Sequence, residues 1–129
     1  AVVKAAKDFF TEDASVITLT YLGGEKMVPN YNVMGVAKAA LDASVRYLAA
    51  EYGQQGVRVN AISAGPIRTV SAKGVGDFNS ILDSIEERAP LHRNVTTEQI
   101  GQSGLFLLSQ MSSGVTGEIL HVDSGFHIL

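Results

Sequence analysis

The sequence predicts an α/β fold built on a parallel sheet, and three observations carry this prediction. The run Ser15–Thr20 is β-branched and apolar without a charge, which is typical of a strand covered on both faces. From about Asn30 to Tyr52, apolar residues recur at steps of three or four, which predicts a long helix. The run Val57–Ser63 predicts a second strand. Strand, helix and strand together form a βαβ unit with a right-handed crossover.

The predicted helix has recognisable ends. Pro29 prevents an earlier start, and Gly53 is expected to terminate it. Its apolar stripe is narrow, which suits a helix–helix contact as well as packing on the sheet. The stripe consists of Met34, Ala37, Leu41, Val45, Leu48 and Tyr52. Residues 54–56 are a predicted turn before the second strand.

Other signals predict the flanking elements. The segment Ala1–Phe10 has a helical pattern. Thr96 and Gln99 fit a capping box, which predicts a helix from there to about Gln110. The segment Gly117–Gly125 predicts a third strand and a turn. Because the chain starts inside a helical pattern without a cap or an initiator methionine, we expect it to belong to a longer chain.

Composition narrows the class of protein. The 129 residues suit one modest domain, and an apolar content of 46% is ample for a core. The net charge of −3 argues against a nucleic-acid or membrane partner. The absence of cysteine excludes a disulfide framework and a thiolate metal site, and no apolar run approaches the ~20 residues that cross a bilayer. We therefore expect a cytoplasmic protein.

Tyr31 and Lys38 are candidates for a shared site. They are seven residues apart, which on a helix places them within about 20° of each other and about 10.5 Å apart along the axis. A third body could lie between them, and the nicotinamide ribose of a dinucleotide has a suitable length. A nearby cation lowers the pKa of a phenol, so Lys38 is expected to favour the anion of Tyr31. The spacing alone equally allows an interfacial tyrosine and a solvated lysine.

Three stretches then suggest a family. Tyr21, the segment Pro29–Gly35 with Lys38, and the segment Arg58–Thr69 resemble the bacterial enoyl-acyl carrier protein reductases, and the resemblance runs through essentially all 129 residues. That family places six residues between the catalytic tyrosine and lysine, as here. Most short-chain dehydrogenases place three, and would have lysine at position 35, where this sequence has glycine.

The resemblance implies the carboxyl-terminal half of a doubly wound, Rossmann-like parallel sheet, with residues 1–129 forming part of a single domain. The Gly-rich turn that would bind the pyrophosphate is not in the sequence, so the amino-terminal half of the cofactor site is expected to be absent. The implied activity is the NAD(P)H-dependent reduction of trans-2-enoyl thioesters on acyl carrier protein, in fatty acid synthesis. NADH and NADPH both stay open, and the 129-residue piece alone is expected to be inactive.

The resemblance also implies roles for individual residues. Tyr31 would donate a hydrogen bond to the thioester oxygen, Lys38 would hold the nicotinamide ribose, and Tyr21 would line the substrate side and assist catalysis. The loop after the second strand would bind the nicotinamide and flank the pyrophosphate, through Gly65, Pro66, Ile67, Arg68, Thr69, Val70 and Ser71. The alternative for this loop is a Gly-Pro turn that simply ends the strand.

Residues 70–90 are expected to form a mobile substrate flap, because two glycines, at 74 and 76, precede an amphipathic run. Phe78 is the candidate acyl contact, with a core position as the equal alternative. Docking of the acidic carrier protein would rest on Lys73, Arg88 or Arg93. His121 is expected to be a strand or interface residue. His92 and His127 have no evident carboxylate partner and receive no role.

Two further functions stay open. A 3-oxoacyl (carbonyl) reductase of the same superfamily would have a catalytic serine before the tyrosine, and Tyr21 stands against it. A non-catalytic assembly module would pair through the long helix. The resemblance itself implies a homo-oligomer, a tetramer, with this helix in subunit contacts.

Overall fold

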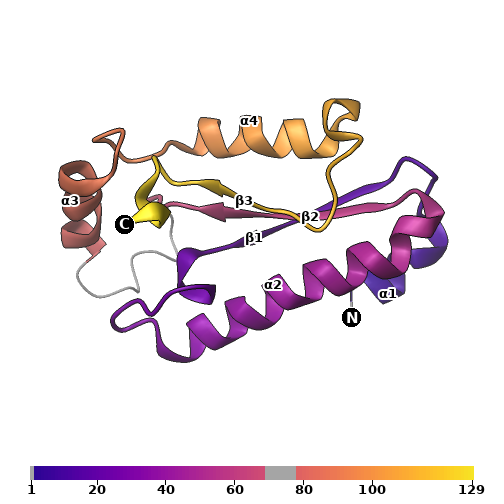
Figure 1. Ribbon diagram of the computed structural model, residues 1–129, viewed down its shortest axis with the longest axis horizontal. Helices are drawn as coiled ribbons and strands as arrows, with labels where there is room; N and C mark the ends of the chain where they lie inside the picture. Colours follow the sequence, from indigo (N-terminus) through magenta and orange to yellow (C-terminus); the bar gives the residue numbers. More distant parts are fainter. Residues whose placement is uncertain (1, 69–77) are drawn as a thin grey trace.

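The computed structural model describes residues 2–68 and 78–129. A parallel sheet with strand order β1-β2-β3 lies at the centre, formed by β1 (Ser15–Thr20), β2 (Arg58–Ala64) and β3 (Ile119–Val122). The helices α1 (Val2–Ala6) and α2 (Asn32–Tyr52) cover one face, α4 (Thr97–Leu108) covers the other, and α3 (Phe78–Arg88) lies beyond one end of the sheet (Figure 1). The predicted α/β fold with a parallel sheet is confirmed.

The central strand contributes most of the core. β2 is buried from Arg58 to Ser63 and pairs with β1 in a register that runs from Ser15↔Arg58 to Thr20↔Ser63. One apolar cluster joins β2 to α2 and consists of Val45, Ala49, Tyr52, Val57, Val59 and Ala61. A second cluster joins β2 to α4 and consists of Ile62, Ile100 and Leu107. The prediction that β1 is covered on both faces is confirmed, because Val16 packs against the cluster shared with α2 and Ile17 against the cluster shared with α4. β1 is an edge strand whose residues are mostly half-buried.

The start of α2 differs from the predicted one, and its end is confirmed. The helix begins at Asn32, and Tyr31 is its N-cap residue. Asn30, with φ of 64°, adopts a left-handed conformation that asparagine tolerates, and this delays the helix. The helix ends at Tyr52 with Gly53 as its C-cap, as predicted, although Gly53 is not left-handed: its φ is −59°, and a 3₁₀ turn continues to Gln55. Gly56, with φ of 77°, makes the reversal.

The other elements follow the sequence closely. The capping box is present: the Thr96 hydroxyl accepts from the Gln99 amide at 3.2 Å, and the Gln99 side chain accepts from the Thr96 amide at 3.1 Å. The third strand lies inside the predicted segment. Across the described parts of the chain, no helix combines the length and the apolar character that spanning a membrane requires.

Candidate active site

The two tyrosines meet where β1 ends. Tyr21 directly follows β1, and Tyr31 stands just before α2. Between them lie a short 3₁₀ turn, η2 (Leu22–Gly24), and a loop. The two rings contact edge to face, with centroids 5.0 Å apart and an interplanar angle of 66°. Residues that are ten positions apart in sequence therefore present their side chains to one place.

Glycines make this arrangement possible. A Cβ on Gly23 would lie 2.8 Å from Cε1 of Tyr31, and a Cβ on Gly24 would lie 3.0 Å from the Lys38 carbonyl carbon. A Cβ on Gly35 would lie 2.7 Å from the Gly23 carbonyl oxygen. Each distance is below ordinary contact, so no larger side chain fits while the turn stays seated on α2. The glycine at position 35, where the commoner spacing would place lysine, is thus required by the turn.

The environment keeps both phenols protonated. Burial raises the pKa of Tyr31 above its usual value of 10.0. Burial also raises the pKa of Tyr21, and repulsion from Tyr31 raises it further. The net pKa shift of Tyr31 is thus upward, and the Lys38 ammonium binds a backbone carbonyl in this structure, so its effect on a tyrosine pKa stays a prediction. Both tyrosines can therefore donate a hydrogen bond at neutral pH.

Lys38 reaches the same end of the sheet. Its Nζ donates to the carbonyl oxygen of Leu19 at 3.0 Å, and its side chain is half-buried. This bond uses one of the three ammonium donors. The remaining two donors suit the adjacent hydroxyls of a ribose, so the position of Lys38 fits the predicted role.

One turn after Lys38, the carboxylate of Asp42 is buried against η2 without a hydrogen-bond partner in the described residues. The sequence did not predict this buried carboxylate.

The loop after β2 leaves the same edge of the sheet as Tyr21, because the strands are parallel and Thr20 is in register with Ser63. Gly65 donates to the Val122 carbonyl at 2.9 Å, and its missing side chain makes room for Val95 and the Asp123 backbone. The chain itself thus requires this glycine. Pro66 and Ile67 line a hollow with α3 and the start of α4. Thr69, Val70 and Ser71 lie outside the described residues.

Only part of the predicted flap is described. Phe78 begins α3 and is half-buried, and Leu82 and Ile85 are the buried residues of this helix. Arg68 Nη1 donates to Asn79 Oδ1 at 3.1 Å, so the β2 loop and α3 are linked directly. The glycines at 74 and 76 and Lys73 lie outside the described residues. The flap and the acyl contact of Phe78 stay predictions.

The structure confirms the predicted position of His121 and contradicts the prediction for His127. His121 lies in β3, as predicted, with its Nε2 3.0 Å from Glu25 Oε1. The statement that His127 lacks a carboxylate partner is wrong: its Nδ1 is 2.9 Å from Asp123 Oδ1. The sequence did contain a sign of this contact, because Asp123 and His127 are four residues apart in the predicted turn after β3. Within residues 2–68 and 78–129, no group of three or more acidic, histidine or cysteine side chains could hold a metal ion.

Comparison with known proteins identifies the family. A family model for enoyl-(acyl carrier protein) reductase matches residues 1–127. The chain belongs to this family. It is 69% identical to the enoyl-acyl-carrier-protein reductase (NADH) of Bacillus subtilis, with 99% of this chain and 50% of that protein covered. It is 62% identical to the enoyl-acyl-carrier-protein reductase (NADPH) of Staphylococcus aureus, with the same coverage.

Solved reductases have the same fold. The Bacillus cereus enoyl-acyl carrier protein reductase, in complex with NADP+ and indole naphthyridinone, matches with a TM-score of 0.97 and 66% identity, over 99% of this chain and 50% of that one. The Aquifex aeolicus enzyme (NADH) matches with a TM-score of 0.94 and 40% identity, over the same shares. The predicted Rossmann-like class is thus confirmed. The chain spans about half the length of the curated relatives it matches.

Proposed function

We propose that this chain is the carboxyl-terminal, catalytic-helix half of an NADH- or NADPH-dependent enoyl-acyl carrier protein reductase of fatty acid synthesis. The observation that carries the proposal is the family match over residues 1–127, on a fold that brings Tyr21, Tyr31 and Lys38 to one end of the sheet. The Gly-rich amino-terminal half of the domain would complete the cofactor site. Cofactor and carrier-protein substrate are part of this proposal.

The proposed chemistry divides among the residues as follows. When bound, the reduced nicotinamide would supply the hydride that adds to the β-carbon of the enoyl thioester. Tyr31 donates a hydrogen bond from its phenol to the thioester oxygen, where negative charge develops, and Tyr21 lines the substrate side next to it. Lys38 binds the ribose hydroxyls, and the β2 loop flanks the cofactor with Gly65–Arg68 together with residues 69–71. A donor aimed at a developing oxyanion in a dry site is worth about 3 kcal/mol of barrier.

Tyr31→Phe in the full-length protein tests this proposal. The substitution removes only the phenol oxygen, so we expect turnover of a crotonyl thioester to fall at least about a hundredfold, while assembly is retained. Turnover is measured from cofactor oxidation, and assembly by light scattering. Tyr52→Phe is the matched control, because Tyr52 is the last residue of the same helix, at the end opposite Tyr31, and is buried against Phe10. Unchanged turnover of Tyr31→Phe with intact assembly would favour the assembly module instead.

We further propose a cytoplasmic homo-oligomer, a tetramer by family resemblance, that uses α2 in subunit contacts. Large apolar side chains on this helix support the proposal, since Val33, Val36 and Tyr47 are 72–79% exposed. Covering such side chains in an assembly removes apolar surface from water.

A further inference from the structure

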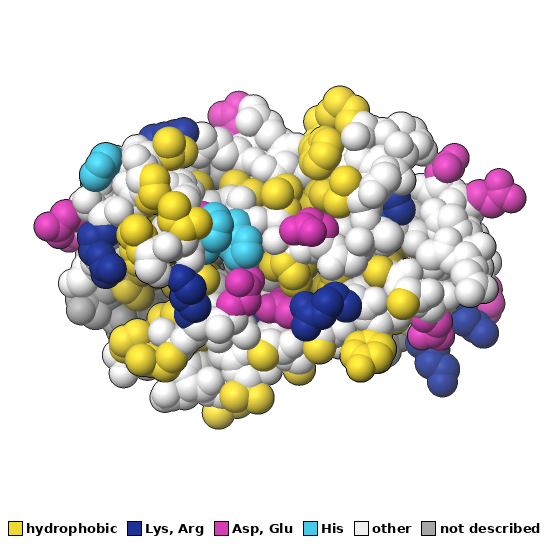
Figure 2. All heavy atoms as spheres, viewed as in Figure 1, with side chains coloured by type: hydrophobic (Ala, Val, Ile, Leu, Met, Phe, Trp, Pro, Cys, Tyr) yellow, Lys and Arg dark blue, Asp and Glu magenta, His cyan; other side chains and the backbone are white. Residues whose placement is uncertain are grey.

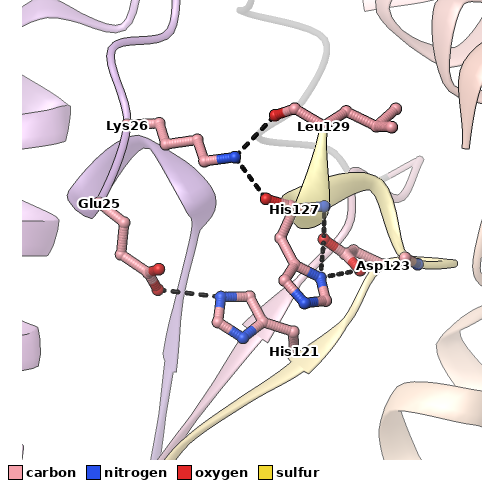
Figure 3. A network of polar contacts seen from close by, with 7 residues as sticks. Glu25, Lys26, His121, Asp123, His127 and Leu129 are labelled. Carbon is pink, nitrogen blue, oxygen red and sulfur yellow. Dashed lines mark hydrogen bonds and ion pairs between the residues drawn. The ribbon is translucent and has the colours of Figure 1, made fainter.

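Charged side chains join the loop between β1 and α2 to the last residues of the chain (Figure 3). Glu25 Oε1 lies 3.0 Å from His121 Nε2. The next residue, Lys26, donates its ammonium to the carbonyl oxygens of His127 and Leu129, the latter at 2.7 Å. Two consecutive loop residues of opposite charge therefore hold two parts of the carboxyl-terminal segment.

Asp123 holds the turn after β3, which contains the carbonyl groups that Lys26 binds. Its carboxylate accepts from the Gly125 amide at 3.0 Å and from the His127 amide at 2.9 Å, and it also contacts the His127 ring. The rings of His121 and His127 stack, with centroids 4.1 Å apart and an interplanar angle of 18°. Histidine side chains lie beside acidic and basic ones on the face that Figure 2 shows. The turn after β3 is thus a defined platform for the loop.

Backbone hydrogen bonds connect Glu25 and Lys26 to the turn between Tyr21 and Tyr31. The Gly24 amide donates to the Tyr21 carbonyl at 2.9 Å, and the amides of Glu25 and Lys26 both donate to the Leu22 carbonyl at 2.9 Å. Gly23, inside the same turn, lies against the Tyr31 ring. A displacement of Glu25 therefore moves the turn that follows Tyr21 and the surface on which Tyr31 rests.

We propose that Glu25, Lys26 and His121 are positioning residues, which hold the η2 turn where Tyr21 and Tyr31 must stand for the reaction. This inference rests on the proposed reductase function, and it adds the turn after β3 to the parts that shape the site. A contact between two partly exposed side chains such as Glu25 and His121 contributes little to the free energy of unfolding. A misplacement of about 1 Å can lower turnover about a hundredfold. The signature of positioning is therefore reduced turnover at nearly constant thermal stability.

The experiment uses Glu25→Ala, His121→Ala and the double variant in the full-length protein. We expect each single variant to lower kcat for a crotonyl thioester about tenfold, with KM for the cofactor changed less than about twofold. The double variant should be no slower than either single one, because both remove the same contact. Glu25→Gln keeps an acceptor opposite His121 and should retain kcat within about threefold. The midpoint of thermal unfolding should stay within about 2 °C of the parent.

Controls separate this proposal from the one on which it rests. Glu118→Ala should leave kcat unchanged, because Glu118 is exposed just before β3 and its carboxylate has no partner in the described residues. Lys26→Met breaks the loop contacts independently and should also lower kcat. If Tyr31→Phe abolishes turnover while Glu25→Ala and Lys26→Met keep the parental kcat, positioning is overturned and the reductase assignment stands. Full turnover by Tyr31→Phe overturns the donor role of Tyr31, and absence of enoyl thioester reduction by the parent protein overturns the reductase assignment. Multiplying effects in the double variant would overturn the shared contact.

Discussion

Tyr21 shows how a neighbour and burial together set the state of one side chain. In the folded chain, burial and then Tyr31 raise its pKa above 10.0, the value that applies to an unfolded chain. The folded state therefore holds this proton to higher pH than the unfolded state does. By linkage, the stability that Tyr21 contributes is fully present below about pH 10 and is lost as pH rises through the folded pKa.

The corresponding prediction concerns Tyr21→Phe in the full-length protein. Because the variant has no phenol to titrate, its free energy of unfolding should decline less steeply than that of the parent above about pH 10. Urea unfolding at a series of pH values measures this slope. Parallel curves for the parent and Tyr21→Phe would contradict the raised pKa.

Gly23 gives a second prediction at this scale. Gly23→Ala places a methyl group against the Tyr31 ring, so the turn or the ring must move. We expect kcat to fall at least about tenfold and the free energy of unfolding to fall by about 1–3 kcal/mol. Gly101→Ala is the control, because a Cβ there meets nothing within 4 Å and lies in α4. It should stabilise the protein by up to about 1 kcal/mol and leave kcat unchanged.

At the scale of elements, Arg58 attaches α4 to the sheet. Its buried guanidinium donates to the Leu107 carbonyl at 2.9 Å, the Ser109 carbonyl at 3.1 Å and the Ser112 hydroxyl at 2.7 Å. These groups lie at or just beyond the carboxyl end of α4, where unpaired carbonyls and the helix dipole favour a cation. The buried charge is thus satisfied by helix-end oxygens.

Arg58→Lys should therefore be costly although it keeps the charge. A lysine cannot reproduce the fork of donors, and we expect a loss of about 2 kcal/mol in the free energy of unfolding. Arg46→Lys, on the exposed side of α2, should cost less than about 0.5 kcal/mol. Urea unfolding of both variants measures the difference. Equal effects would show that the helix-end contacts of Arg58 do not contribute.

Signals that act along the chain predicted the elements well. The β-branched runs, the period of α2 and the Thr96–Gln99 box each depend on residues close in sequence, and each is present in the structure. Local sequence also placed Tyr21 and Tyr31 near each other, because the two residues flank the single connection from β1 to α2. What local patterns could not predict is the conformation of single residues such as Gly53, which depends on how the next strand is reached.

Contacts between distant segments could not be predicted. Glu25 and His121 are 96 positions apart, and Arg58 and Leu107 are 49 apart, so only the assembled sheet brings them together. The partner of Lys38 could not be predicted for the same reason. Spacing placed Lys38 on the same side of the helix as Tyr31, but the Leu19 carbonyl, supplied by β1, binds the ammonium. Binding of the Lys38 ammonium to a ribose therefore has to be tested in the presence of the cofactor.

At the scale of the whole molecule, β1 and β3 are the edge strands of the described sheet. β1 forms one edge, and Leu19 in it is 53% exposed. This chain spans about half of the length of the related reductases. In the function that we propose, the other half supplies the Gly-rich pyrophosphate turn. An uncovered strand edge presents free backbone groups and apolar side chains to other chains.

The last prediction therefore concerns residues 1–129 expressed alone. We expect no oxidation of NADH or NADPH with a crotonyl thioester, because Tyr31 and Lys38 without the pyrophosphate turn do not bind the cofactor in a productive position. We also expect concentration-dependent association through the open edge of β1, seen by light scattering. The full-length protein under the same conditions is the positive control. Measurable turnover by the isolated piece would show that the site at the end of β1 and β2 is sufficient, and the proposed division of the active site between two halves would then be wrong.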